Sequence, residues 1–110
     1  MDHSERAVAC FKEGFNCAQA VLSPFAPELG LERETALKIA GTFGGGMGRL
    51  GEVCGAVTGA LMVLGLKYGC TDAQDPEGKE AAYRLVREFA DRFRARHGAL
   101  RCRDLLGCDI

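Results

Sequence analysis

The sequence has no tryptophan, and its aromatic residues are limited to six phenylalanines and two tyrosines among 110 residues. It also has no apolar run long enough for a bilayer, because the longest one, VCGAVTGALMVLGL at 53–66, is short and interrupted by glycine. The charges nearly cancel, to a formal net charge of −1. This balance gives no electrostatic reason to expect nucleic acid or an acidic membrane as a partner. We therefore expect no nucleic-acid partner and no membrane-spanning segment.

We also expect no secretory signal, because the first ten residues, MDHSERAVAC, are polar and charged and contain no apolar core. We therefore expect a cytoplasmic location, where thiols are normally kept reduced. Six cysteines in 110 residues is a high number. In that compartment they are expected to be packing residues, metal ligands or redox groups, and a structural disulfide framework is the least expected of the choices.

Helical patterns account for most of the chain, and no segment has a convincing strand pattern. We predict an all-α fold in one domain, 1–110: a compact bundle of about five helices around a glycine-rich, apolar central helix. Asn16, with Gln19 three residues later, predicts a capping box that starts a helix at Cys17. The predicted helices are 4–14, 17 to about 23, 32–41, 52–69 and 80–98, followed by a short helical turn at 102–107. Their predicted apolar faces are Val8, Phe11 and Phe15; Ala36, Ile39, Ala40 and Phe43; and Ala82, Leu85, Val86, Phe89 and Phe93.

A glycine-rich stretch, FGGGMGRLGEVCGAVTGA at 43–60, contains GMGRLG, which fits the dinucleotide fingerprint GxGxxG. That fingerprint requires a preceding strand and a following helix, whereas a predicted helix precedes it here. We therefore interpret the stretch as a connector that brings Cys54 to the first turn of the next helix. A bound anion or cofactor at that helix start stays open. The candidate residues for it are Gly48, Gly51, Glu52 and Gly55, with Glu52 also a candidate proton relay.

Three cysteines lie at predicted helix starts: Cys17, Cys54 and Cys102. Unpaired N–H groups and the helix dipole favour a thiolate there. Cys10 and Cys70 are interpreted as structural, and Cys108 is either a resolving thiol or part of a frayed end. No C-x-x-C or C-x-x-C-H pattern occurs, so neither a thioredoxin-like motif nor attached haem is expected.

Four segments resemble the C_GCAxxG_C_C family of redox-active proteins: GFNCAQAVL (14–22), FGGGMG (43–48), GEVCGAVTGALMVLGLKYG (51–69) and CRDLLG (102–107). CGAVTG at 54–59 matches the family signature. The resemblance implies a small helical bacterial or archaeal protein that uses Cys17, Cys54 and Cys102. It also implies a fourth cysteine in a further C-terminal segment, which is replaced by Cys108 or lies outside this chain, and a transporter-associated partner.

Three functions follow as alternatives. In the first, Cys54 is the nucleophilic thiolate of a thiol–disulfide exchange protein, with Cys17 or Cys102 as its resolving partner and an unknown redox partner. In the second, Cys17, Cys54 and Cys102 hold zinc or an iron–sulfur cluster, with Cys108, His97 or a partner chain as the fourth ligand. In the third, the protein is a helical interaction protein with incidental cysteines, and the groove formed by Gly51, Gly55 and Gly59 packs a homodimer.

Overall fold

The computed structural model describes residues 2–107, and within that range every regular element is helical. The helices are α1 (His3–Lys12), α2 (Cys17–Leu22), α3 (Arg33–Ala40), α4 (Gly55–Tyr68), α5 (Pro76–His97) and α6 (Cys102–Leu106), with a short 3-10 helix η1 (Pro27–Leu29). The predicted all-α class is confirmed. None of these helices combines the length and the apolar character that a membrane crossing requires.

The core surrounds α2, which contacts α1, α3 and α4. Its side chains at 18, 20 and 22 are all buried. Small residues dominate this core, so the short helices approach one another closely. The buried cluster consists of Ala18, Leu22, Ala26, Ala36 and Ala40, with Leu31, Phe43, Met62 and Val63 packed against it.

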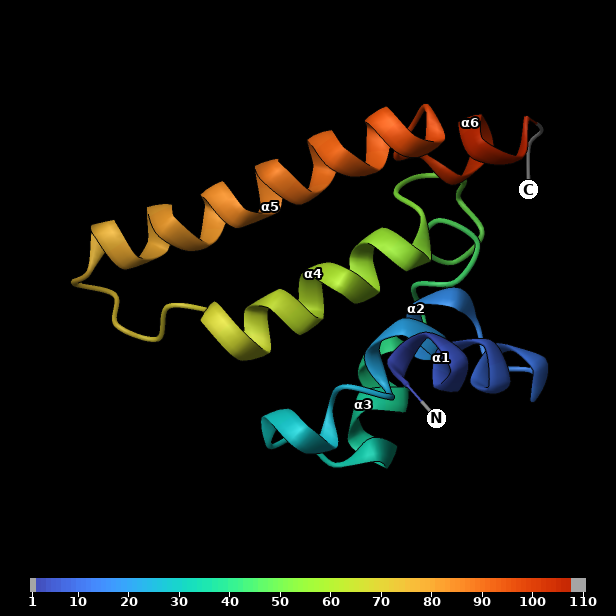
Figure 1. Ribbon diagram of the computed structural model, residues 1–110, viewed down its shortest axis with the longest axis horizontal. Helices are drawn as coiled ribbons and strands as arrows, with labels where there is room; N and C mark the ends of the chain where they lie inside the picture. Colours follow the sequence, from blue (N-terminus) through green and yellow to red (C-terminus); the bar gives the residue numbers. More distant parts are fainter. Residues whose placement is uncertain (1, 108–110) are drawn as a thin grey trace.

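The helix at the centre of the bundle differs from the prediction. The all-round apolar character of 52–69 suggested that this segment would be the surrounded one, but the buried residues of α4 are Gly55, Val57 and Gly59, all in its first half. Met62 and Val63 still pack against the core cluster, whereas residues 65–68 at the end of α4 are exposed and extend beside α5, away from α1, α2 and α3 (Figure 1). The shorter α2 therefore holds the central place.

The predicted apolar faces of the first and third helices are partly wrong. Val8, Phe11 and Ile39 are 53%, 59% and 48% exposed. In α1 the buried residue is Cys10 instead, whereas in α3 the predicted Ala36 and Ala40 are buried. The core is built from alanines at close helix crossings, so the larger side chains of these helices remain outside it.

Helix α5 begins at Pro76, four residues before the predicted start at Glu80. The preceding Asp75 accepts a hydrogen bond from the backbone N–H of Gly78 (3.0 Å). Asp as a cap followed by Pro at the first helical position is a strong helix start, and the predicted start at Glu80 missed it.

Candidate functional site

The start of α2 is fixed by a capping box. The Asn16 side-chain oxygen accepts from the Gln19 N–H (2.8 Å), and the Gln19 side chain accepts from the Asn16 N–H (2.9 Å). This confirms the predicted cap and makes Cys17 the first residue of the helix. Backbone N–H groups that no carbonyl of the helix can reach therefore surround the Cys17 side chain.

The same two cap residues attach α2 to the end of α3. The Asn16 amide nitrogen donates to the carbonyls of Ala40 (3.3 Å) and Gly41 (3.2 Å), and the Gln19 amide nitrogen donates to the Leu37 carbonyl (2.9 Å). This second role of the cap could not be read from local spacing, because it depends on how α3 approaches. The result is that Cys17 and the beginning of the glycine loop are held by one network.

The glycine loop contains a left-handed turn, in which five successive residues have positive φ: Gly45 (63°), Gly46 (71°), Met47 (66°), Gly48 (60°) and Arg49 (64°). The backbone bond from the Gly48 N–H to the Thr42 carbonyl (2.8 Å) helps to close this turn. Left-handed backbone costs an L-residue about 1–2 kcal/mol, so glycine is favoured here and the two other residues are strained. The motif GMGRLG thus describes a turn between two helices.

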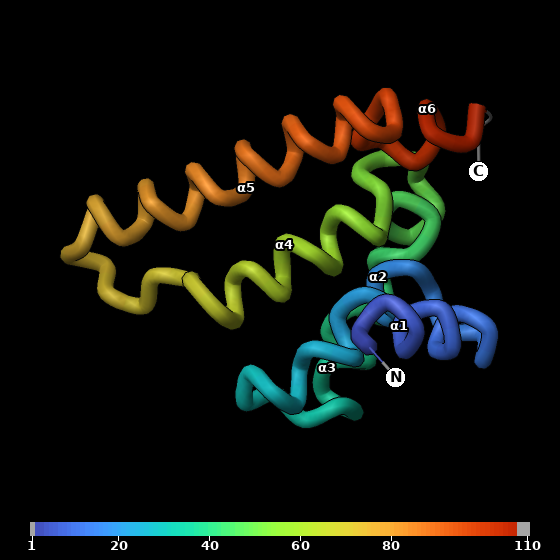
Figure 2. The backbone as a smooth tube through the Cα atoms, viewed as in Figure 1, coloured from blue at the N-terminus to red at the C-terminus, as the bar shows by residue number. Residues whose placement is uncertain are grey.

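Residues 100–103 run antiparallel to residues 51–54 and pair with them. The Cys54 N–H donates to the Leu100 carbonyl (2.8 Å), and the Cys102 N–H donates to the Glu52 carbonyl (2.6 Å), with Val53 and Arg101 as a bridge pair. Figure 2 shows the green loop lying against the red segment that begins α6. This pairing brings Cys102 from the C-terminal part of the chain to the glycine loop.

The central feature of the site is the contact between Cys17 and Cys54. The Cys54 thiol donates a hydrogen bond to the Cys17 sulfur, which lowers the pKa of Cys17 from 9.0 to about 5. Burial opposes this shift, and backbone N–H groups of Gly45, Cys17 and Gly55 support it. The same hydrogen bond, together with burial, raises the pKa of Cys54. The pair is therefore a thiolate at Cys17 and a protonated thiol at Cys54.

Glycines of α4 make this contact sterically feasible. A Cβ atom at Gly55 would collide with the Cys17 sulfur and lie 2.9 Å from the Ala18 nitrogen, and one at Gly59 would lie 2.9 Å from the Ala18 carbonyl oxygen. The groove expected from the glycine spacing thus exists at these two positions. It is filled by α2 of the same chain, so a dimer partner cannot occupy it there.

All three cysteines predicted from helix starts line one cavity of about 820 Å³. Cys102 is 7% exposed, whereas Cys17 and Cys54 are half-buried. Arg49 is the single cationic side chain in the described lining, and the lining contains no Asp or Glu, so the Cys17 thiolate carries its negative charge. Among the other lining residues, the sequence had singled out Gly48 as a cofactor candidate, Asn16 as a helix cap and Phe11 as part of an apolar face. It had not singled out Gly14, Gly41, Thr42, Gly44, Gly45, Arg49, Leu105 and Leu106.

The remaining described cysteines lie elsewhere. Cys10 is buried, with its sulfur 3.5 Å from the Ser23 hydroxyl oxygen. Cys70 is exposed, and its thiol donates to the Asp72 carbonyl (3.3 Å). Neither of them lines the cavity that holds the other three.

The candidate cofactor residues have different places. Gly48 lines the cavity, whereas Gly55 lies against the Cys17 sulfur. Gly51 is packed on Arg103, since a Cβ there would lie 2.9 Å from the Arg103 Nε. Glu52 contributes its backbone to the pairing with Cys102. The structure thus gives Gly51, Glu52 and Gly55 structural roles in the loop and in the helix crossing.

The candidate metal ligands do not form a cluster within residues 2–107. No group of three or more His, Cys, Asp or Glu side chains in that range is placed to hold a metal ion. His97 lies against Phe93 on α5, with ring centroids 4.5 Å apart. Cys108 lies outside the described residues.

A thiolate hydrogen-bonded to a second thiol, on an all-helical scaffold, defines a cysteine-based protein with redox-competent sulfur atoms. The chain belongs to the family described as "Putative redox-active protein (C_GCAxxG_C_C)", whose profile matches residues 15–109. Comparisons with curated proteins and with solved structures gave no match. The family description agrees with a redox role at the general level and names no substrate.

Proposed function

We propose that the protein performs thiol–disulfide exchange, with Cys17 as the attacking thiolate and Cys54 as the resolving thiol. The hydrogen bond from Cys54, which lowers the pKa of Cys17 to about 5, is the observation that supports this best. At neutral pH Cys17 is then present as the thiolate, which is the nucleophilic form. The sequence suggested Cys54 for the attacking role. The proposal exchanges the two roles because the pKa of Cys54 is raised.

The exchange proceeds in two steps. In the first, the Cys17 sulfur attacks one sulfur of a substrate disulfide, a mixed disulfide forms, and the other substrate sulfur leaves as a thiolate. In the second, the Cys54 sulfur attacks the Cys17 sulfur, the Cys17–Cys54 bond forms, and the remaining substrate sulfur leaves. The proton of Cys54 passes to a departing thiolate. The substrate gains two electrons, which the cysteine pair loses, and a dithiol reductant restores the pair by the reverse steps.

The raised pKa of Cys54 is compatible with its role in the second step. The largest cause of the shift is the hydrogen bond to Cys17. Formation of the mixed disulfide removes the negative charge of Cys17, so this cause disappears when Cys54 must ionise. The backbone N–H groups of Ala56 and Val57, which favour the Cys54 thiolate, remain in place.

Cys102 lines the same cavity and is proposed as a third thiol that can exchange with the Cys17–Cys54 disulfide. A disulfide-bearing redox partner, with a transporter-associated protein as one candidate, and a cytoplasmic location belong to the same proposal. Zinc or iron–sulfur binding is the alternative. It requires a ligand outside the described residues, such as Cys108 or a residue of a partner chain, because residues 2–107 contain no group of three suitable side chains.

The test is the rate at which iodoacetamide alkylates Cys17 as a function of pH, in reduced protein. The rate follows the thiolate fraction, so it should rise with pH through a midpoint near 5. Cys54→Ala removes the donor and should move the midpoint upward, toward the ordinary value of 9.0. Cys54→Ser keeps a donor and should give a smaller shift.

Cys70→Ala is the matched control, because Cys70 is exposed and lies away from the pair. This variant should leave the midpoint of Cys17 unchanged. A wild-type midpoint near 9.0, or the same midpoint in Cys54→Ala as in the wild type, would contradict the proposal. Alkylation that becomes fast only after chelator treatment would instead favour the metal alternative.

A further inference from the structure

The hairpin formed by α4 and α5 is poorly covered by the rest of the described chain. Helix α5 is 22 residues long and has no buried residue, although its sequence carries an apolar stripe. The second half of α4 is apolar nearly all round, yet Leu66 and Tyr68 are 38% and 50% exposed. A helix that is apolar on all sides is normally surrounded, whereas here Met62 and Val63 pack against the core and residues 65–68 beyond them remain exposed.

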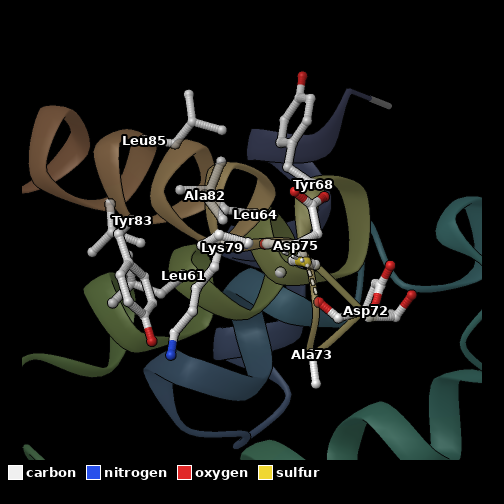
Figure 3. Close-up of a pocket in the computed structure, with 16 residues that line it drawn as sticks. Leu61, Leu64, Tyr68, Asp72, Ala73, Asp75, Lys79, Ala82, Tyr83 and Leu85 are labelled. Carbon is white, nitrogen blue, oxygen red and sulfur yellow. Dashed lines mark hydrogen bonds between the residues drawn. The ribbon is translucent and has the colours of Figure 1, made fainter.

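A cavity of about 670 Å³ lies between the two helices near the tip of the hairpin (Figure 3). Apolar side chains from both helices contribute to its lining, among them Leu61, Leu64, Leu85 and Val86. Tyr83, which is 51% exposed, and Lys79 lie together on one side of it, whereas Asp72 lies on the other. The surface around the cavity is thus apolar with charges of both signs at its edges.

The charges along the hairpin are separated by sign. The segment 72–80, at the tip, contains four carboxylates and one lysine, a formal charge of −3. The segment 84–96, which leads back toward the thiol site, contains five arginines and two carboxylates, a formal charge of +3. Two identical hairpins in antiparallel orientation place each tip opposite the other's oppositely charged segment. A parallel arrangement would place the two tips opposite each other and the two positive segments opposite each other, so that like charges would meet.

We propose that a second copy of this chain covers the hairpin, in an antiparallel, twofold-symmetric four-helix arrangement. A twofold contact requires a surface that is complementary to itself, and the segments 72–80 and 84–96 meet that requirement in charge. Packing two such hairpins buries the exposed apolar side chains in the way of a four-helix bundle. This contact is separate from the groove at Gly55 and Gly59, which α2 fills, and it does not depend on the thiol chemistry.

Charge reversal tests the orientation directly. The tip variant is Glu77→Lys with Glu80→Lys, and the partner variant is Arg92→Glu with Arg96→Glu; all four positions are exposed. An antiparallel dimer of either variant alone would bring like charges face to face. Like charges at an interface are costly, so the dimer dissociation constant should rise at least about tenfold. An equimolar mixture of the two variants restores opposite charges at both contacts and should form a heterodimer.

Sedimentation equilibrium under reducing conditions gives the readout, and the midpoint of Cys17 alkylation serves as a control that each variant remains folded. The preference of the mixed variants for heterodimers should disappear near 1 M salt, because the screening length there is about 3 Å. A monomeric wild-type chain at ~100 µM, two orders above a micromolar dissociation constant, would overturn the proposal. Heterodimers of the tip variant with the wild type, without heterodimers between the two variants, would overturn the antiparallel orientation.

Discussion

The sulfur of Cys17 has neighbours that few other residues would permit. Gly55 lies so close that any Cβ there would collide with this sulfur. The same closeness allows the backbone N–H of Gly55 to support the thiolate. At the residue scale, the site depends as much on missing side-chain atoms as on the two thiols.

A pair of Gly→Ala substitutions in α4 separates this role from helix propensity. Gly55→Ala should lower the free energy of unfolding by about 1–3 kcal/mol through overpacking, and it should change the alkylation midpoint of Cys17. Gly65→Ala is the matched control, because a Cβ there meets nothing within 4 Å; it should raise stability by about 0.5–1 kcal/mol. Denaturant titration at equal protein concentration measures both effects, and equal effects at the two positions would argue against the contact.

The roles of the three thiols could be predicted only in part. Position at a helix start singled out Cys17, Cys54 and Cys102, and these three do share a cavity. Which thiol carries the charge could not be predicted, because it depends on the hydrogen bond from Cys54 to Cys17 and on the N–H groups of Gly45 and Gly55 that support the Cys17 thiolate. These groups come from a loop and from a second helix, whose approach local spacing does not define.

At the scale of elements, the glycine loop acts as a rigid connector. Gly46 lies inside it, where a Cβ would come within 2.6 Å of the Glu52 nitrogen and 2.8 Å of the Cys102 Cβ. Gly48 has a similar positive φ, but the nearest atom to a Cβ there is the Thr42 carbonyl oxygen at 3.9 Å. The two glycines therefore share the backbone requirement and differ in the space around them.

Because the space around the two glycines differs, alanine should lower the free energy of unfolding by different amounts at positions 46 and 48. Gly48→Ala should lower the free energy of unfolding by about 1–2 kcal/mol, the cost of left-handed backbone. Gly46→Ala should cost more, at least about twice as much, because overpacking adds to that strain. It should also loosen the pairing of Glu52 with Cys102 and speed the alkylation of Cys102. Similar costs for the two variants, with slow Cys102 alkylation in both, would contradict the packing of this loop.

Element types were more predictable than their surroundings. The capping box at Asn16 is a local signal, and it appeared as predicted. The position of α4 was not predictable from its apolar character, because the same pattern suits a central helix and a helix whose last turn extends beyond the core. The predicted burial of Ile39 failed for a related reason, since α3 contacts the core through Ala36 and Ala40 and leaves Ile39 exposed.

At the scale of the whole molecule, the chain has two regions with different surfaces. Helices α1, α2 and α6 and the glycine loop line the thiol cavity. The α4–α5 hairpin extends away from α1, α2 and α3 (Figure 1), and its apolar side chains are only partly buried. The first region explains the chemistry and the second explains why one copy of the chain leaves a long helix uncovered. The dimer proposed for the hairpin keeps the thiol cavity outside the contact, so the two can be tested independently.

The most direct test of the central claim is to identify the disulfide that forms when the reduced protein meets a small disulfide substrate. Free thiols are then alkylated, and the products are mapped by intact and peptide mass spectrometry. We predict that Cys17 reacts first and that the wild type proceeds to a Cys17–Cys54 disulfide while exposed Cys70 remains alkylatable. The double variant Cys54→Ala, Cys102→Ala, which lacks both other thiols of the cavity, should stop at a mixed disulfide on Cys17. A first reaction at Cys70, or a stable disulfide that omits Cys17, would contradict the assignment of this pair as the redox centre.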